Sequence, residues 1–337
     1  MTDNHLARNS CNLLLNMKHL YTTLCLAALA IVNCQAQLKP EYQNAGKTTA
    51  SAVFNVTANP DIPSLITFAG EKVDFDRLDM AERIDRELTS IIYGQTSTLL
   101  CFKRANRYFP VLAKILKEQS VPLDFLYLAC TESTMDTYAY SPAHAAGLWQ
   151  LLAATARQYG LEVTDEVDER YDPERSTVAA CKYLKAAYNK YGHWPTAAAS
   201  YNAGMGKISG ELSRQGTNSS FDLYLVSETS RYVFRIMAYK MIFENPKRYG
   251  YRLRTKQLYQ PVNYKIVEVN SSVASWVSWA KQQGITYAQL RDANPWIRTT
   301  KLTNNSGKTY RVRIPVSSDL YRSKRKFTAY SKAWVVD

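Results

Sequence analysis

The sequence predicts a mainly α-helical protein that ends in a small α/β module, and two observations support this division. Between about residues 73 and 251, apolar residues recur every three or four positions, which is typical of amphipathic helices that share one core. After Tyr259-Gln260-Pro261 the pattern changes to short apolar runs separated by turn residues, which indicates a unit that contains strands. At 337 residues the chain is long enough to hold both parts.

The helical part is marked by its periodicity and by residues that begin and end helices. Apolar residues at helical spacing predict helices over residues 78–92, 108–116, 172–188 and 233–241. The third of these opens with Asp-Pro, a typical helix start, and glycines follow several of the helical runs. We therefore expect one all-α domain over residues 73–251.

The C-terminal module, residues 259–315, alternates strand and helix signals. A strand-like run covers residues 262–267, a short helix is expected over residues 273–280, a second helical stretch contains Leu290, and a closing strand covers residues 309–315. This order of strand, helix, helix and strand predicts a compact α/β unit.

The N-terminal segment, residues 1–36, has the pattern of an export signal. Lys18 precedes an apolar run that is too short for a membrane anchor, and small or tolerated residues lead to a cleavage point after Ala36. Lipid attachment at Cys34 is the less favoured alternative, because Asn33 is not the small residue that normally precedes a lipidated cysteine. Either route predicts an exported protein of the periplasm or cell envelope.

Two polar segments flank the predicted domains. Residues 37 to about 61 are rich in Ala, Asn and Thr without hydrophobic periodicity, which predicts a polar linker that we expect to reach residue 72. Residues 316–337 are expected to form a basic tail. Its run at residues 322–326 is either simply solvated or holds the protein near an anionic polymer of the envelope.

The composition argues against several classes of function. A net charge of +13 favours polyanionic surroundings, but the basic residues are spread out and no nucleic-acid-binding motif accompanies them. The four histidines have no metal-ligand spacing, no glycine-rich phosphate loop is present, and Cys101, Cys130 and Cys181 fit buried free thiols. We therefore expect no cofactor, no metal site and no nucleic-acid partner.

Glu132 is the candidate catalytic residue. It follows an apolar helical run that begins near Pro122, and partial loss of water in such surroundings raises the pKa of a carboxyl group. A carboxyl that keeps its proton near neutral pH can protonate a glycosidic oxygen. Most glutamates are simply solvated, so the argument depends on the motifs that accompany this one.

Three short motifs together supply an acid, amides, aromatic rings and glycines that permit close approach. They are, in chain order, Thr131-Glu132-Ser133, Gly147-Leu148-Trp149-Gln150 and Tyr201-Asn202-Ala203-Gly204. Such groups suit the binding and cleavage of a polar sugar polymer. Asp136 is the obvious second carboxylate of an ordinary glycosidase, but a helix cap or a solvated turn explains it better.

These motifs resemble the catalytic domain of lytic transglycosylases of the soluble and membrane-bound D type. The resemblance covers roughly residues 100–251 and includes a Glu-Thr-x-x-Tyr motif at residues 228–232. It implies a goose-lysozyme-like helical fold and cleavage of the MurNAc-GlcNAc β-1,4 bond of peptidoglycan, with 1,6-anhydromuramoyl ends. The C-terminal module resembles a LysM carbohydrate-binding module without the usual glycine-threonine opening. It either binds glycan or is an accessory domain.

The resemblance also implies roles for individual residues. Glu132 would act alone, first as the acid toward the leaving oxygen and then as the base toward the muramoyl 6-hydroxyl. The residues expected to bind substrate are Ser133, Ser141, Trp149, Gln150, Tyr201, Asn202 and Tyr232. For Trp149 a place in the core is an equal alternative, and Glu228 is expected to be structural.

The chain departs from the family pattern close to the acid. Thr134, Met135 and Asp136 replace a typical Gly-Phe-Asn run, and His144 stands where the family usually has glycine. These changes leave two alternatives open. One is a lysozyme-type hydrolase that uses Glu132 with water, and the other is a catalytically silent protein that binds the wall. The expected partner in every case is the glycan strand of peptidoglycan.

Overall fold

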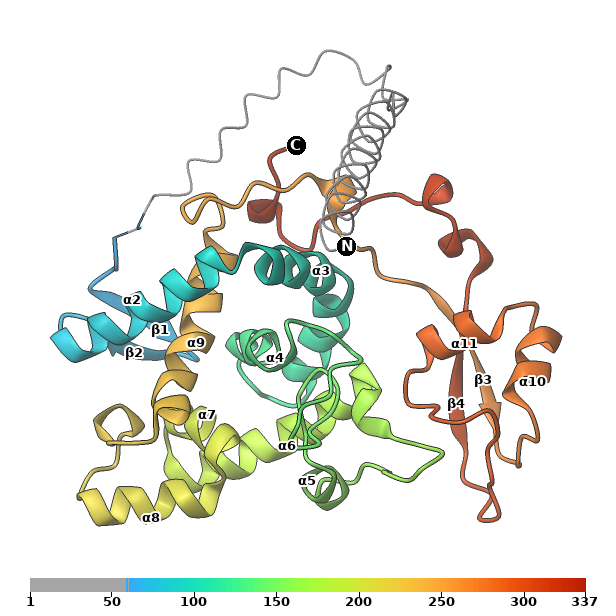
Figure 1. The fold of residues 1–337 in the computed structure, drawn as a ribbon, viewed down its shortest axis with the longest axis horizontal. Helices are drawn as coiled ribbons and strands as arrows, with labels where there is room; N and C mark the ends of the chain where they lie inside the picture. Colours follow the sequence, from blue (N-terminus) through green and yellow to red (C-terminus); the bar gives the residue numbers. More distant parts are fainter. Residues whose placement is uncertain (1–58, 60) are drawn as a thin grey trace, which may run out of the picture. The chain divides into compact units, whose positions relative to one another are not determined.

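The computed structural model describes residues 59 and 61–337, so the expected export signal and Cys34 lie outside the described residues. Within them the protein is mainly helical, which confirms the predicted fold class (Figure 1). The helices of the larger part are α2 (Leu78–Tyr93), α3 (Gln95–Glu118), α4 (Leu126–Ser133), α5 (Ala153–Gln158), α6 (Pro173–Tyr191), α7 (Trp194–Ala203), α8 (Met205–Gln215) and α9 (Ser227–Glu244).

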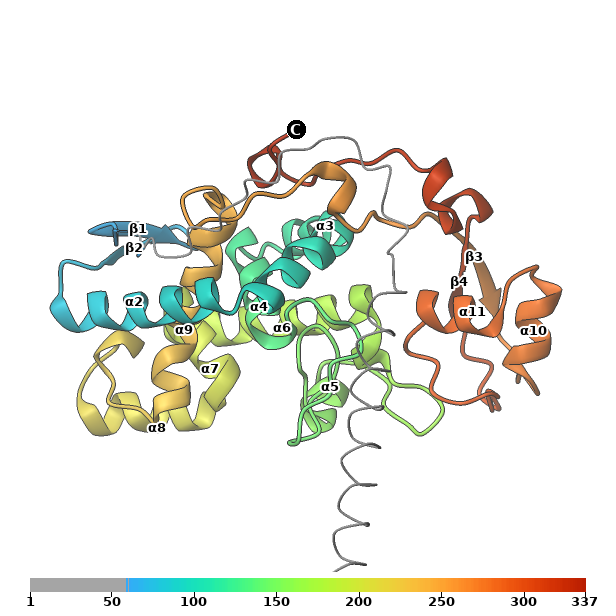
Figure 2. The same ribbon diagram turned by 45° about the horizontal axis from the view of Figure 1, so that its top comes forward.

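Helix α9 lies at the centre of the helical core. Its buried residues include Val233, Phe234, Ile236 and Met237, which point to different sides of the helix. Helices α2, α4 and α7 pack against it, as Figures 1 and 2 show for α2 and α7. A helix that is apolar on most sides needs neighbours around it, so α9 fixes the positions of α4 and α7, which carry the candidate site.

Helix α6 begins where the sequence predicts. The Asp172 carboxylate accepts hydrogen bonds from the backbone N–H groups of Glu174 and Arg175, and Pro173 occupies the first turn. Gly192 ends the helix with a left-handed φ of 71°. The cap makes Asp172 a buried anchor, and the same carboxylate also contacts the C-terminal module.

An antiparallel hairpin precedes α2, and its strands are β1 (Leu65–Phe68) and β2 (Glu71–Asp74). The predicted linker over residues 37–72 is therefore wrong from Leu65 onward. Phe68 and Val73 are buried against the helical core, and Gly70 supplies a φ of 86° at the turn. Two strands of four residues are too short to give a clear alternating pattern, which explains why the sequence did not reveal them.

The C-terminal module has its own small core, and its elements are β3 (Tyr264–Val269), α10 (Trp276–Gln282), α11 (Tyr287–Ala293) and β4 (Tyr310–Pro315). This order confirms the prediction, although β3 and α10 begin slightly later than expected. The two strands pair antiparallel. Trp276, Leu290, Ile297 and Val312 are fully buried between the sheet and the two helices.

The chain after β4 returns to the helical core. Trp334 is buried against Phe102, Phe109 and Phe243, and its indole Nε1 donates to the Phe243 carbonyl oxygen at 2.8 Å. The expectation of a basic tail over residues 316–337 is therefore wrong for the last residues, which belong to the core. The apolar run around Trp334 covers only residues 333–336, which is too short for a periodic signal, so only the folded chain reveals this contact.

Among residues 59 and 61–337, no helix combines the length and apolar character that a bilayer crossing requires. Cys101, Cys130 and Cys181 are buried and not bridged by disulfides, as the sequence predicted.

Candidate active site

Glu132 lies in the last turn of α4, on a helix whose other residues are largely apolar. Leu126, Leu128, Ala129 and Cys130 are buried, which places the helix in the interior of the helical part. Glu132 itself keeps part of its surface exposed. Glu132 therefore lies at the edge of largely apolar surroundings.

The protonation of Glu132 depends on this environment. Burial raises the pKa of Glu132 to about 7, and the negative charge of Glu228 acts in the same direction. The hydroxyl of Tyr232 donates a hydrogen bond to Glu132 Oε1, and this bond and the positive charge of Arg235 lower the pKa in part. The carboxyl thus holds its proton in a large share of molecules at neutral pH and has a neutral donor beside it.

Helix α7 brings two further predicted site residues to the same region. The Tyr201 hydroxyl donates to the Trp149 carbonyl oxygen at 2.8 Å, and the negative charge of Glu132 helps to raise the pKa of Tyr201 after burial, the main cause. Asn202 Oδ1 accepts a hydrogen bond from the Thr229 hydroxyl at 3.0 Å. The hydrogen bonds of Tyr201 and Asn202 therefore connect α7 to the 147–150 segment and to the start of α9, with Tyr201 close enough to Glu132 to feel its charge.

The loop between Thr134 and Gln150 forms another side of the site. Gln150 Nε2 donates to the carbonyl oxygens of Ala139 and Gly147, at 3.1 and 2.9 Å. Gly147 has a φ of 77°, and a Cβ placed there would lie 1.9 Å from the Arg170 carbonyl oxygen. The glycine of this motif is thus required by backbone packing, and the glutamine amide holds the loop in shape.

Ser141 and His144 form the tip of this loop. The Ser141 hydroxyl accepts from the Ala145 N–H at 3.1 Å and is only partly buried, so it can still donate to a ligand. His144 has a φ of 63°, a left-handed backbone conformation that favours glycine. Its Nδ1 lies 2.6 Å from the Tyr140 hydroxyl, and this contact holds the imidazole at the exposed tip.

Two residues predicted to bind substrate do not face the site. Ser133 is buried, and its hydroxyl donates to the carbonyl oxygens of Ala129 and Leu148. Trp149 has no exposed surface, and its Nε1 donates to the Thr177 hydroxyl at 2.8 Å. The predicted contacts of Ser133 and Trp149 with substrate are wrong, and for Trp149 the core alternative holds. Both residues face inward because they join α4 and the 147–150 segment to the core.

Tyr232 is also almost fully enclosed, with 3% of its surface exposed. Its hydroxyl is directed at the Glu132 carboxyl. A residue in this position orients the acid and tunes its pKa, whereas the sequence had suggested a contact with the sugar.

Other carboxylates around the acid have different surroundings. Asp136 pairs with Arg104 at 2.8 Å and accepts from the Tyr138 N–H at 2.9 Å, which agrees with the expected turn role. Glu228 is exposed in the first turn of α9. The negative charge of Glu228 helps to raise the pKa of Glu132, although the sequence suggested a structural role for Glu228.

The sequence reasoning missed Arg235. It pairs with the buried Glu87 at 3.1 Å, and its charge also lowers the pKa of Glu132. Arg235 lies three residues after Tyr232, on the same face of α9, and this spacing could have indicated it. Among the described residues no group of three or more His, Cys, Asp or Glu side chains is placed to hold a metal ion.

Comparison with protein families gives two matches, one for each part of the chain. Residues 110–223 match the model of the transglycosylase SLT domain. Residues 265–318 match the soluble lytic transglycosylase C-terminal LysM-like domain. The first range contains Glu132, Ser141, Gln150 and Tyr201, whereas Tyr232 lies beyond it.

Individual curated proteins are also similar to parts of the chain. The chain is 32% identical over 218 residues to membrane-bound lytic murein transglycosylase D of Escherichia coli K12, covering 63% of this chain and 47% of that protein. It is 30% identical over 118 residues to a putative tributyltin chloride resistance protein of Alteromonas, covering 35% of this chain and 57% of that protein. The chain thus spans about half the length of the curated relatives it matches.

Solved structures of lower identity also align with part of the chain. The 70 kDa soluble lytic transglycosylase of Escherichia coli is 22% identical, with a TM-score of 0.38, over 50% of this chain and 30% of that one. An inactive variant of lytic transglycosylase Slt from Pseudomonas aeruginosa is 21% identical, with a TM-score of 0.33, over 40% and 24% of the two chains.

Proposed function

Because the chain joins a transglycosylase SLT domain to a LysM-like C-terminal domain, we propose that it is a peptidoglycan lytic transglycosylase. It cleaves the β-1,4 bond between MurNAc and GlcNAc and leaves 1,6-anhydromuramoyl ends. The observation that carries the proposal is Glu132, a carboxyl in apolar surroundings whose pKa is raised to about 7. Such a group can give up a proton and take one back within a single catalytic cycle.

The reaction proceeds in two proton transfers at Glu132. The protonated carboxyl donates to the glycosidic oxygen as the bond from that oxygen to the muramoyl anomeric carbon breaks. The resulting carboxylate then accepts the proton of the muramoyl 6-hydroxyl, whose oxygen bonds to the anomeric carbon. Glu132 ends the cycle protonated again, and water is not consumed. One carboxyl group is therefore sufficient, whereas a hydrolase of the usual kind needs two.

The neighbouring residues support this cycle in different ways. Tyr232 holds the Glu132 carboxyl in place through its hydrogen bond. The Tyr201 hydroxyl bonds α7 to the 147–150 segment, which keeps that segment beside the acid. Ser141, at the partly exposed loop tip, offers a hydroxyl to the N-acetyl group of the sugar. Gln150 shapes that loop through its own amide and contributes the remaining amide oxygen.

Mass spectrometry of the muropeptides released from purified sacculi tests the proposal. The wild-type chain should release products with 1,6-anhydromuramoyl ends, and Glu132→Gln should reduce their rate of formation by at least about a hundredfold. Glu118→Gln, an exposed carboxylate on α3, is the matched control and should cleave like the wild type. Cleavage that survives in Glu132→Gln would remove the catalytic assignment.

A lysozyme-type hydrolase is the second candidate, because the charge of Glu228 acts on Glu132. A second carboxylate near the acid can position a water molecule for attack on the anomeric carbon. Hydrolysis predicts reducing muramic ends, and these ends should disappear in Glu228→Gln while the anhydro ends persist. Their absence in the wild type would exclude this candidate.

The proposal extends to the C-terminal domain and to the location of the protein. A hollow of about 470 Å³ lies between the β3–α10 loop and α10, lined among others by Asn270, Ser271 and Trp279. Amide, hydroxyl and aromatic groups are suited to a sugar ring, which supports glycan binding by this domain. An exported protein of the periplasm or cell envelope would meet this polymer. Binding of residues 37–337 to sacculi in the Glu132→Gln background tests this part.

A further inference from the structure

A second hollow, with a volume of about 540 Å³, is formed jointly by the catalytic domain and the LysM-like domain. The catalytic domain contributes Tyr138, Tyr140, Arg157 and Tyr171 to its lining, and the LysM-like domain contributes Arg298. The volume lies in the range of small-ligand sites. None of the residues with a role in the proposed cleavage reaction lines this hollow.

The lining combines aromatic rings with guanidinium groups that have unused donors. Arg298 lies over the Tyr171 ring, 4.1 Å from its centroid, and one of its nitrogens donates to the Pro295 carbonyl oxygen. Arg157 donates to the Val163 carbonyl oxygen through one nitrogen. Among residues 59 and 61–337, neither arginine pairs with a carboxylate, so both have N–H groups available for an anionic ligand.

The position of Arg298 is fixed by contacts between the two domains. Its backbone N–H donates to the Glu166 carbonyl oxygen at 2.9 Å, and the Asp168 N–H donates to the Trp296 carbonyl oxygen at the same distance. Val167 and Ile297 form an antiparallel bridge between these bonds. The wall of the hollow that belongs to the LysM-like domain is therefore attached to the catalytic domain through the main chain.

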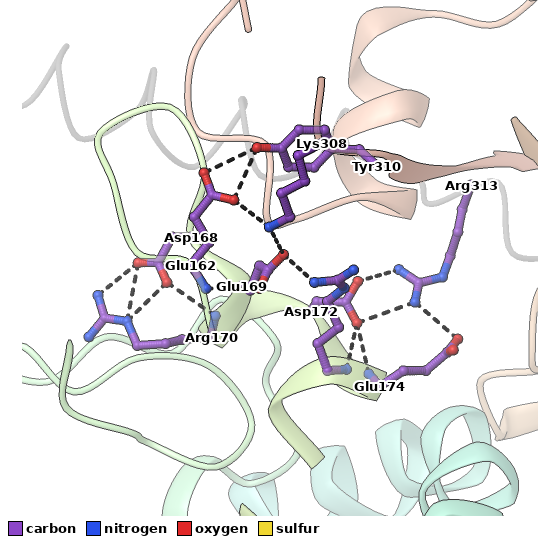
Figure 3. A network of polar contacts seen from close by, with 10 residues as sticks. Glu162, Asp168, Glu169, Arg170, Asp172, Glu174, Lys308, Tyr310 and Arg313 are labelled. Carbon is purple, nitrogen blue, oxygen red and sulfur yellow. Dashed lines mark hydrogen bonds and ion pairs between the residues drawn. The ribbon is translucent and has the colours of Figure 1, made fainter. Parts of the chain in front are cut away.

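Ion pairs also join the LysM-like domain to the catalytic domain near these main-chain bonds (Figure 3). Lys308 contacts the carboxylates of Glu162 and Glu169, and the Tyr310 hydroxyl donates to Glu162. Arg313 pairs with the buried Asp172, which caps α6, at 2.6 Å. Its guanidinium helps to lower the pKa of Asp172 against the opposing effect of burial, which is the largest influence. Both partners of this buried pair are thus satisfied.

The hollow is also continuous with the loop of the active site. Tyr140 lines the hollow and precedes Ser141, the residue proposed to hold the N-acetyl group. Arg170, also in the lining, donates to the carbonyl oxygens of His144 and Leu151, at 2.8 and 3.1 Å, on either side of the loop. A glycan in the active site would therefore have its substituents close to this hollow.

We infer that the hollow binds the peptide stem of the glycan strand through the carboxylate groups of the stem. The inference rests on the proposed function and extends it from the sugar to the peptide. A neutral sugar gives the two free guanidinium groups no charge to pair with, whereas a stem peptide carries carboxylates for Arg157 and Arg298. Asp165 is exposed in the same lining, and its carboxylate can accept a hydrogen bond from an amine of the peptide.

The test compares two substrates with the full chain and with Arg298→Gln. The substrates are glycan strands that carry stem peptides and the same strands after an amidase has removed them. Arg298→Gln should lower kcat/KM about tenfold on the peptide-bearing strands and less than about twofold on the stripped strands. Arg157→Gln, on the catalytic-domain side of the hollow, should show the same selectivity. Lys281→Gln removes an exposed positive charge from α10 and is the matched control.

A binding measurement separates this inference from the proposed function. The isolated stem peptide, titrated into the Glu132→Gln chain, should bind about ten times more weakly once Arg298→Gln is added. Equal losses on both substrates, no loss on either, or unchanged peptide binding would each overturn the inference. If the wild type released no products but the peptide still bound through Arg298, the proposed function would fail and the peptide site would stand.

Discussion

At the scale of single residues, the proposed reaction depends on the proton of Glu132. Burial raises the pKa of this carboxyl to about 7, and the Tyr232 hydroxyl acts against that increase. The free enzyme needs the protonated form for the first step. We therefore expect kcat/KM to fall about tenfold per pH unit above pH 7. A profile that stayed flat up to pH 9 would contradict the assignment of Glu132 as the acid.

Removal of the tyrosine hydroxyl should shift this profile. Tyr232→Phe deletes a hydrogen bond that favours the charged carboxylate, so the pKa of Glu132 should rise and the falling limb should move to higher pH. The rate at the optimum should fall about tenfold, because the carboxyl loses its orientation. Tyr239→Phe, on the same helix, should leave the limb in place. Profiles of kcat/KM for both variants would decide the role of Tyr232.

The same carboxyl should make the stability of the protein depend on pH. The folded state binds the Glu132 proton more tightly than the unfolded chain does. This group's contribution is therefore fully present below the unfolded pKa of about 4.3, and it is lost as the pH rises through about 7. The stabilisation by Glu132→Gln should thus be larger at pH 8 than at pH 4, by at most about 4 kcal/mol. Denaturant unfolding at both values measures the difference, with Glu118→Gln as a control that shows no such change.

Residue roles were only partly predictable from the sequence. The position of Glu132 at the end of an apolar helix indicated its environment, because burial of neighbouring residues follows from local composition. The inward direction of Ser133 and Trp149 did not follow from any motif. Ser133 is fixed by Leu148, which lies 15 positions further along the chain. Trp149 is fixed by Thr177, which lies 28 positions further along.

At the scale of elements, Gly147 packs the loop of the active site against the segment that precedes α6. A Cβ at this position would lie 1.9 Å from the Arg170 carbonyl oxygen. Gly147→Ala should therefore lower the free energy of unfolding by about 2–4 kcal/mol, since both the left-handed backbone and the contact oppose a side chain. Gly210→Ala, in α8 with open space around it, should be neutral or slightly stabilising. Equal stability of the two variants would contradict the packing argument.

The elements themselves differed in how far the sequence revealed them. Helices such as α2 and α6 have strong apolar periodicity or a capping residue, and they were predicted close to their observed bounds. The hairpin β1–β2 was missed, because strands of four residues are too short for an alternating pattern. Its place depends on Phe68 and Val73, which contact helices far away in the sequence.

At the scale of the whole molecule, the chain leaves the helical core, forms the LysM-like domain and then returns to the helical core with its last residues. Trp334→Ala should therefore destabilise the helical core by about 3–5 kcal/mol, because a fully packed indole would leave a cavity among Phe102, Phe109 and Phe243. Tyr321→Ala, which removes an exposed ring from the same C-terminal segment, should change stability by less than about 0.5 kcal/mol. Urea unfolding of both variants provides the measurement.

In the proposed reaction the anomeric carbon of the cleaved linkage bonds to the substrate's own 6-hydroxyl oxygen and not to water. Cleavage of sacculi by residues 37–337 in water enriched in oxygen-18, followed by mass spectrometry of the new glycan ends, tests this claim most directly. The proposed reaction should give 1,6-anhydromuramoyl ends that contain no heavy oxygen. New muramic ends that carry one heavy oxygen atom would identify a hydrolase, and binding to sacculi with no new ends would identify a catalytically silent wall-binding protein.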